Sequence, residues 1–286
     1  MRKNQSSLTA MGIAVARAVE SEKPESERIC FDPYARSFVS PWLYGFMRFF
    51  IKTGYAEQRG PGVLGFLLAR ERYIDDTLQA SLDEGLQQLV ILGAGFDSHA
   101  YRFEGLRDGV KVFEVDHPAT QADKLKKLNQ MFGRFPEYVT YVPVDFNSQI
   151  LANRLLESGY RPDLKSLFIW QGVCMYLIAA AVDTTLAFVV KCAASGSAIV
   201  FDYIYQSVLE GVQVHGEVRN MRRYRFMTGE GLTFCIPEGT VEAFLKKRGF
   251  RLVEDVNADN LKQAYFTGKN AARKVASGYG IALGTV

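Results

Sequence analysis

Short apolar runs recur along the chain from residue 88 onward, separated by stretches in which apolar residues return at helical spacing. Near-continuous apolar runs are typical of strands that are buried on both faces of a sheet. We predict strands over Leu89–Leu92, Lys111–Val115, Val139–Val142, Ser166–Trp170, Ala198–Tyr203, Arg251–Val256 and Ile281–Val286. The helices predicted between them are Thr120–Phe132, Gln149–Glu157, Ala179–Ala194 and Val241–Arg248. This alternation indicates a largely parallel, doubly wound α/β sheet, because right-handed crossovers place helices on both of its faces.

The first part of the chain has a helical and irregular pattern instead. Its first apolar residues, Leu8, Met11, Val15 and Val19, fall close to helical spacing. We therefore expect an amphipathic helix packed on the domain rather than a transit peptide. A second helix is expected from about Leu67 to Leu82. Residues 1–88 are interpreted as a helical cover that belongs to the same domain as a core at 89–286, with a substrate-side insertion near 206–235.

The segment Trp42–Phe50 is rich in aromatic residues. It fits either a helix lying in a membrane interface or a mobile cover over an apolar pocket, and both interpretations stay open. On the second, Trp42 and Phe46 contact the substrate. No apolar run approaches the ~18–20 residues of a membrane span, so none is predicted.

Composition narrows the classes of protein. With 286 residues, 48% of them hydrophobic and 13% aromatic, the chain is neither disordered nor a small disulfide scaffold. Its net charge of +3 comes from interspersed charges, so nucleic-acid binding is not expected. The four cysteines lie far apart without a C-x-x-C pair, which argues against a zinc site and predicts a reducing, cytoplasmic location.

The sharpest local feature is the turn Gly93-Ala94-Gly95, which directly follows a buried strand. In open α/β sheets, ligands bind at the carboxyl ends of the strands, and glycines there let the backbone approach a ligand closely. A tight turn without a ligand stays the alternative. A dinucleotide fingerprint needs a third glycine where Ser98 stands, which disfavours an NAD(P)-dependent oxidoreductase.

Polar residues also follow the next strands of the predicted sheet. Glu114 and Asp116 end the second strand, where an acid can accept hydrogen bonds from ribose hydroxyls, as in NAD and S-adenosylmethionine sites. Asp145 and Phe146 follow the third, where a carboxylate and a ring suit adenine. Gln171 follows the fourth. A solvated strand end or a helix cap is the alternative for each acid, but their convergence at one edge favours a nucleotide-like ligand.

The chain resembles the leucine carboxyl methyltransferase-like family of S-adenosylmethionine-dependent O-methyltransferases, in particular its bacterial branch. The segments that carry the resemblance are Thr9-Ala10 with Ala16-Arg17-Ala18, Phe31–Ala35, Ala69-Arg70 with Asp75-Asp76, Ile91–Gly95 with Asp97 and Tyr101-Arg102, Phe113–Pro118 with Lys124, Val142–Phe146, and Gln171–Val173 with Met175–Leu177. The resemblance implies a Rossmann-like class I methyltransferase fold, with a mostly parallel seven-stranded sheet, an antiparallel seventh strand and N-terminal helices that roof the acceptor pocket.

The resemblance also implies S-adenosyl-L-methionine as cofactor, with S-adenosyl-L-homocysteine as product. Arg70 would reach the methionine carboxylate. The cofactor-binding residues it implies are Arg70, Gly93, Ala94, Gly95, Asp97, Glu114, Asp116, His117, Asp145, Phe146 and Gln171. Many relatives have Arg where His99 stands and Glu where Gln171 stands, so this chain departs from the pattern at two positions.

Methyl transfer from a sulfonium is an in-line displacement that depends on alignment of the reacting atoms. A carboxylate acceptor, with a pKa of ~4, needs no base, whereas a phenol or enol, with a pKa of ~10, profits from one. We name Tyr176, His215 and Tyr34 as catalytic candidates. Arg222 and Arg223 are candidates for attracting an acidic substrate, although a solvated basic helix is the alternative there.

These observations favour an O-methyltransferase whose acceptor is a small, acidic or aromatic, polyketide-like molecule. Three other functions stay open. They are a methyltransferase acting on a protein's C-terminal carboxylate, a non-catalytic S-adenosylmethionine-binding module and, less favoured, an oxidoreductase.

Overall fold

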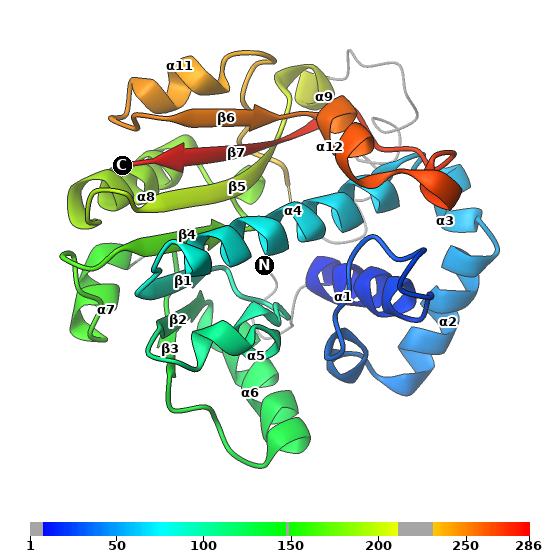
Figure 1. Ribbon diagram of the computed structural model, residues 1–286, viewed down its shortest axis with the longest axis horizontal. Coiled ribbons are helices and arrows are strands. Elements are labelled where there is room, and N and C mark those ends of the chain that lie inside the picture. The colour runs from blue at the N-terminus through cyan, green and yellow to red at the C-terminus, as the bar shows by residue number, and fades with distance from the viewer. Residues whose placement is uncertain (1–7, 147–148, 211–230) are drawn as a thin grey trace.

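The predicted strands can be followed in a computed structural model, which describes residues 8–146, 149–210 and 231–286. The described residues form a seven-stranded sheet in the order β3-β2-β1-β4-β5-β7-β6 (Figure 1). The strands are β1 Gln88–Leu92, β2 Lys111–Asp116, β3 Val139–Pro143, β4 Ser166–Trp170, β5 Ala198–Ile204, β6 Val253–Val256 and β7 Tyr279–Thr285. Strand β7 runs antiparallel to both β5 and β6, while β1 to β5 pair in parallel. The expected fold class, with its antiparallel seventh strand, is confirmed.

The strand order reverses at β1, which lies between β2 and β4. Such a reversal is the place where open α/β sheets bind ligands, because the connections leave β1 and β4 toward opposite faces. Ile91 pairs with Ile169 in parallel register. Gly93 and Gln171, each two residues further on, therefore leave the sheet side by side.

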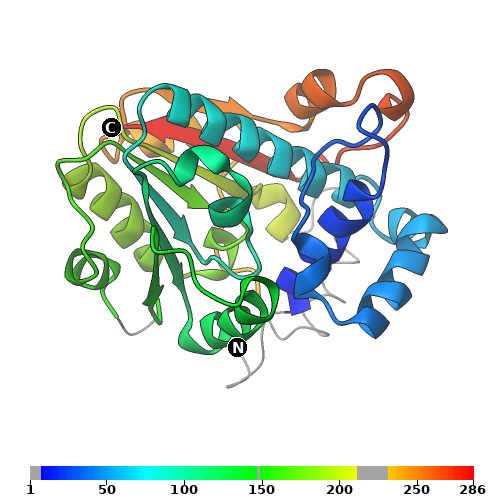
Figure 2. The ribbon, with the colours of Figure 1, turned by 60° about the horizontal axis from the view of Figure 1, so that its bottom comes forward.

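Helices cover the sheet on both faces (Figures 1 and 2). One face carries α4 (Val63–Asp83), α6 (Pro118–Phe132) and α12 (Ala258–Tyr265), and the other carries α7 (Leu151–Glu157), α8 (Ala179–Cys192) and α11 (Val241–Lys246). Successive residues of β1 alternate between the two cores, since Ile91 packs in the first and Val90 in the second. This double burial explains why the strands read as near-continuous apolar runs.

Three N-terminal helices gather at the end of the sheet to which the parallel strands point (Figures 1 and 2). They are α1 (Leu8–Ser21), α2 (Pro41–Lys52) and α3 (Tyr55–Arg59). Helix α1 packs against α2, α4 and the short 3₁₀ turn Ala35–Phe38. The amphipathic start of the chain is thus a helix on the body of the protein, as expected.

Some elements differ from the predictions. Helix α12 was not predicted, although Asn257 before it forms a capping box with Asn260. Strand β6 begins at Val253 rather than at Arg251. The structure also has the short helices α5 (His99–Arg102) and α9 (Gln206–Glu210). Of the expected insertion near 206–235, residues 211–230 lie outside the described residues.

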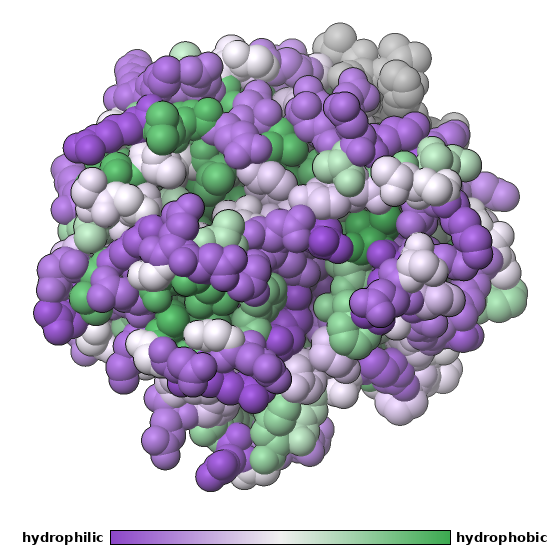
Figure 3. Space-filling view, in the orientation of Figure 1, coloured by the Kyte–Doolittle hydropathy of each residue, from purple (hydrophilic) through white to green (hydrophobic). Residues whose placement is uncertain are grey.

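Hydrophilic residues cover most of the face shown in Figure 3, with hydrophobic residues in separate patches between them. Among the described residues, none of the helices has the length and apolar character needed to cross a membrane.

Candidate functional site

A cavity of about 450 Å³ lies at the carboxyl ends of the parallel strands. This volume falls within the ~300–1,000 Å³ that is usual for small-molecule sites. The residues named from the sequence that line it are Arg70, Gly93, Ala94, Gly95, Asp97, Asp116, His117, Asp145, Phe146, Gln171 and Tyr176. Helix α1 supplies a further wall, with Ala10, Ile13 and Arg17.

The glycine turn after β1 is shaped by sterics. Gly93 has a φ of +71°, and a Cβ there would lie 2.3 Å from Cγ2 of Val173. Gly95 also has a positive φ, of +43°. A side chain at Gly93 would therefore be strained and would collide with the loop that follows β4. The turn holds the backbone open along one side of the cavity.

Arg70 of α4 reaches the cavity as a buried cation, with 2% of its surface exposed. Its Nη1 donates to Oδ2 of Asp202, which is also buried. Oδ1 of Asp202 accepts from the backbone N–H of Gly172 at 2.5 Å. Among the described residues, no hydrogen-bond partner reaches Nη2 or Nε of Arg70. The guanidinium is thus fixed by Asp202 and keeps buried donors suited to an anion.

Asp116 is fixed at the end of β2 by two backbone donors. Its Oδ2 accepts from the N–H of Gly95 at 2.5 Å, and its Oδ1 from the N–H of His117 at 2.6 Å. Burial raises the pKa of the Asp116 carboxyl, although both hydrogen bonds act against the rise. The side chain of His117 caps α6 by accepting from Ala119 at 3.3 Å. The carboxylate is therefore held in one place beside the glycine turn.

Glu71 of α4 is the centre of a buried ionic cluster behind the cavity. Its Oε1 lies 3.1 Å from Nη1 of Arg17 and 2.8 Å from Nη2 of Arg102. Burial alone would raise the pKa of the Glu71 carboxyl, but Arg17, His99 and Arg102 together hold it well below its usual range. The cluster ties α1, α4 and α5 together around an ionised carboxylate.

The same carboxylate orients Gln171. Nε2 of Gln171 donates to Oε2 of Glu71 at 2.9 Å. Because an ionised carboxylate only accepts hydrogen bonds, the amide must turn its N–H groups toward Glu71. Its other end, Oε1, is then the acceptor that Gln171 offers to the cavity it lines.

His99 is fully buried in this cluster. Its Nδ1 lies 2.7 Å from Oδ2 of Asp97, and its Nε2 lies 3.1 Å from Oδ1 of Asp75. Burial disfavours the charged ring, but the attraction of Asp97, with support from Asp75, outweighs it and raises the pKa of His99 to about 9. The pKa of Asp97 falls to about 2 because His99 outweighs the effect of burial there. Because of its raised pKa, His99 is an imidazolium at neutral pH.

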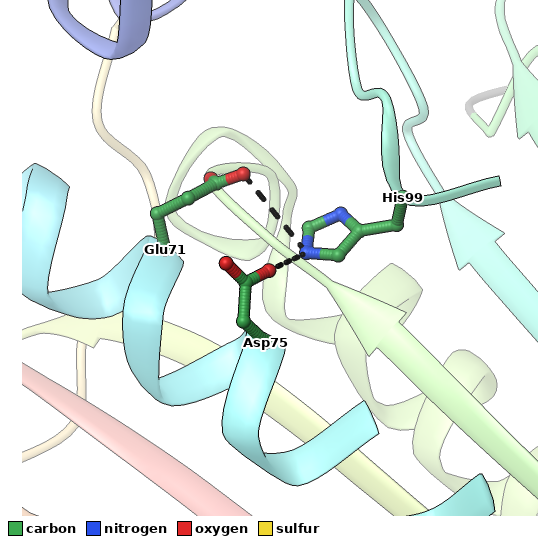
Figure 4. Close-up of side chains that lie close together, drawn as sticks. All are labelled: Glu71, Asp75 and His99. Carbon is green, nitrogen blue, oxygen red and sulfur yellow. Dashed lines mark ion pairs between the residues drawn. The ribbon is translucent and has the colours of Figure 1, made fainter. Parts of the chain in front are cut away.

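Glu71, Asp75 and His99 also lie as close together as metal ligands do, with donor atoms within 4.8 Å of one another (Figure 4). Nη2 of Arg102, however, already contacts Asp75 at 2.5 Å and Glu71 at 2.8 Å. We interpret the three residues as part of the ionic cluster, in which Arg102 and His99 supply the positive charge.

Glu114 is the one cofactor-side candidate that the structure does not bring to the cavity. Its Oε2 lies 2.8 Å from Nζ of Lys124, and both side chains are buried. Glu114 stands two residues, or about 6.6 Å, before Asp116 along β2, which places it under α6 rather than at the strand end. Glu114 thus lies away from the cavity, and its expected place beside the ribose stays a prediction.

Three candidates for the acceptor side also lie away from the cavity. The ring of Tyr34 packs edge to face on Phe132 at 5.2 Å and lines a separate depression with Tyr101 and Tyr138. Trp42 and Phe46 are 76% and 53% exposed, because α2 buries its opposite side through Tyr44. None of these three candidates lines the cavity. The candidates His215, Arg222 and Arg223 lie outside the described residues.

Sequence reasoning gave no role to three residues that shape the site, Arg17, Glu71 and Asp202. Asp202 carries the same signal as Asp116, an acid near the carboxyl end of an apolar run, and could have been found by it. Arg17 and Glu71 lie in helices, and their role depends on contacts with residues far away in the sequence. The pattern of residues along the chain therefore does not indicate that role.

Solved structures of distant sequence share this fold. A crystal structure from Thermobifida fusca, described as a methyltransferase, matches with a TM-score of 0.62 and 14% identity, covering 99% of this chain and 96% of that one. A duf574 family protein from Streptomyces avermitilis matches with a TM-score of 0.61 and 13% identity, covering 99% and 98%. At these identities the likeness concerns the fold.

The sequence comparisons are more specific. The family model described as leucine carboxyl methyltransferase matches residues 10–190. YktD of Bacillus subtilis, named for S-adenosyl-L-methionine-dependent methyltransferase activity, is 30% identical over 94% of each chain. Rv3767c of Mycobacterium tuberculosis, named in the same way, is 29% identical over 76% of this chain and 71% of its own length.

The chain belongs to the leucine carboxyl methyltransferase family. It is an S-adenosylmethionine-dependent methyltransferase of that family, so the family and cofactor expected from the sequence are confirmed.

Proposed function

We propose that the protein is an O-methyltransferase that transfers a methyl group to a carboxylate or hydroxyl of a small, partly apolar acceptor. The observation that carries the proposal is the mixed lining of the cavity. Its polar side chains include Arg70, Asp116 and Gln171, and its apolar or aromatic ones include Ile13, Val173, Tyr176 and Leu177. The polar group suits a zwitterionic nucleoside cofactor, and the apolar group suits an apolar acceptor body.

The donor set fits S-adenosylmethionine residue by residue. The free donors of Arg70 suit its carboxylate, and Oε1 of Gln171 suits its ammonium group. Asp116, held beside the glycine turn, suits the ribose hydroxyls, while Asp145 and Phe146 suit the adenine. When bound, the cofactor supplies an electrophilic methyl group.

The protein's own contribution is alignment and exclusion of water. Holding an acceptor in line with the methyl group can lower the barrier by ~7–11 kcal/mol. A carboxylate acceptor is ionised at neutral pH and needs no base. Tyr176 lines the cavity and is the described candidate for contacting the acceptor, as either a hydrogen-bond donor or a wall.

The experiment is a transfer assay with methyl-labelled S-adenosylmethionine. It compares small aromatic and aliphatic carboxylic acids, phenols of similar size, and a peptide with a free C-terminal leucine. Label in a base-labile ester of a small acid is the expected result. Label in the peptide alone would assign a protein substrate, and cofactor binding without transfer to any acceptor would favour a non-catalytic module. The cytoplasmic location stays a prediction.

A further inference from the structure

Helix α2 is apolar on two opposite sides. Its inner side buries Tyr44 and packs Leu43, Met47 and Ile51 against the first core. Its outer side carries Trp42, Phe46 and Phe49, which are 76%, 53% and 63% exposed. Spacings of four and three residues place these rings on one line along the helix. Exposed apolar side chains gathered in one row usually mark an interaction site, so the outer side calls for a partner.

The exposed rings form one continuous surface. Trp42 stacks on Phe46 at 5.7 Å, Phe46 meets Phe50 at 4.8 Å, and Phe50 meets Tyr55 of α3 at 5.1 Å. Phe49 contacts Phe50 at 5.7 Å. We call these five residues the aromatic stripe. Helix α2 lies at the outer edge of the molecule in both ribbon views (Figures 1 and 2).

The aromatic stripe does not face the catalytic cavity. None of its five residues is among those that line the cavity in the described part of the chain. The sequence left two interpretations of this segment open, a pocket cover and an interfacial helix. The geometry supports the second.

Positive charge borders the aromatic stripe. Arg48 and Lys52 share one acid, Glu22, at 2.8 and 2.7 Å, so this group carries a net positive charge. On α3, the guanidinium of Arg59 lies 5.0 Å from the centre of the Tyr55 ring. Aromatic residues beside basic ones are the pattern of helices that lie in the headgroup region of anionic membranes.

A second copy of the chain fits the aromatic stripe less well. Aromatic side chains have surfaces of about 150–250 Å² each, so the exposed fractions of Trp42, Phe46, Phe49 and Tyr55 amount to about 500 Å². A stable dimer buries about 800 Å² on each partner. Insertion of a few rings into a headgroup layer needs no such extended matching surface.

We propose that the aromatic stripe docks the protein on the surface of a bilayer that contains anionic lipid. Helix α2 packs on α1, and α1 lines the cavity through Ala10 and Ile13. Docking therefore places the α1 side of the cavity near the membrane, where apolar acceptors concentrate. This last consequence rests on the proposed function, whereas docking itself does not.

The two tryptophans make docking directly measurable. The chain has two tryptophans, Trp42 and Trp170. Trp42 is 76% exposed and Trp170 is fully buried. The full-length protein is titrated with vesicles of phosphatidylcholine and phosphatidylglycerol, without any methyl acceptor. A blue shift of the emission maximum, together with co-sedimentation, is the expected result, because Trp42 enters an apolar layer.

The double variant Phe46→Ser/Phe49→Ser keeps Trp42 as the probe and is expected to weaken vesicle binding by about tenfold or more. Leu252→Ser is the matched control, since Leu252 is 72% exposed and lies next to β6. Thermal melts check that each variant folds. Unchanged emission with vesicles, or equal binding by the double variant, would overturn the proposal. So would a concentration-dependent dimer that the double variant abolishes.

Discussion

Gln171 and Glu71, a hundred residues apart in the chain, meet through one hydrogen bond of 2.9 Å. Through it, a carboxylate that does not itself line the cavity decides which end of an amide faces the cavity. The carboxylate is in turn held ionised by Arg17, Arg102 and His99. The side chain at position 171 is thus oriented by a buried charge on α4.

Removing the charge of Glu71 should destabilise the protein. Glu71→Gln leaves the buried Arg17 and Arg102 short of a counter-ion, and breaking a buried pair in this way costs about 3–5 kcal/mol. Chemical denaturation measures the free energy of unfolding. Glu84→Gln is the control, because its pair with Lys165 is largely exposed and should matter by less than about 1 kcal/mol. Equal effects of the two substitutions would contradict the role of the cluster.

Arg70→Lys should raise the KM for S-adenosylmethionine by about tenfold or more, because the two Nη donors of the guanidinium serve Asp202 and the ligand separately. Asp202→Asn should raise KM in the same direction, since Arg70 then loses the charge that fixes it. Steady-state kinetics at saturating acceptor tests both. Arg72→Ala, two residues further along α4 but exposed and paired with Asp76, should leave KM unchanged. A normal KM in Arg70→Lys would refute the assignment.

Stability should fall as pH rises through the pKa of His99. The folded-state pKa is raised from 6.5 to about 9 by Asp97 and Asp75 against the effect of burial. The stabilisation is therefore fully present below about pH 6.5 and lost as pH rises past 9, by about 3 kcal/mol. Denaturation curves between pH 6 and 10 follow this loss. His99→Gln should flatten the profile over that window, and an unchanged slope in the variant would assign the loss to other groups.

Gly93→Ala should impair folding or cofactor binding more than Gly133→Ala does. Both glycines have a φ near +70°, so alanine meets the same backbone strain at each. At Gly93 the new methyl group also collides with Val173, whereas at Gly133 nothing lies within 4 Å. Thermal melts and ligand titrations of the two variants isolate the collision. Adding Val173→Ala should recover part of the loss at Gly93.

Substitutions of Glu114 and Asp116 should affect different properties of the protein. Glu114→Gln is expected to lower stability, because it leaves the buried Lys124 without its counter-ion, with little change in cofactor affinity. Asp116→Asn is expected to weaken cofactor binding, since Asp116 lines the cavity. Parallel titrations and denaturation of the two variants decide the point. Loss of cofactor affinity in a stable Glu114→Gln protein would support the contact with the ribose that the sequence suggested for Glu114.

The central strands could be predicted closely because β1 and β4 are buried along their whole length and therefore appear in the sequence as apolar runs. The edge strand β6 is partly exposed, and its start was predicted less accurately. The cofactor side could be predicted for a related reason. Parallel strands end at one edge, so residues such as Gly93, Asp116 and Gln171 converge whatever the rest of the chain does. The position of Glu114 could not be predicted in this way, because two residues along a strand move a side chain from the edge of the sheet to beneath a helix.

The acceptor side could not be predicted in the same way. Whether Trp42 faces a pocket or the solvent depends on which side of α2 packs on α1. Because both sides of the helix carry apolar residues, the sequence does not indicate which of them is buried. The partners of Glu71 come from α1, α5 and the loop after β4, so their meeting is a property of the folded chain alone.

Calorimetric titration with S-adenosylhomocysteine tests the central claim most directly. The wild-type protein is predicted to bind one molecule per chain, and folded Arg70→Lys to bind it at least about tenfold more weakly. Titration with NAD is predicted to release no heat of binding. Absence of binding by the wild-type protein, or equal affinity in Arg70→Lys, would contradict the account of this cavity as the cofactor site.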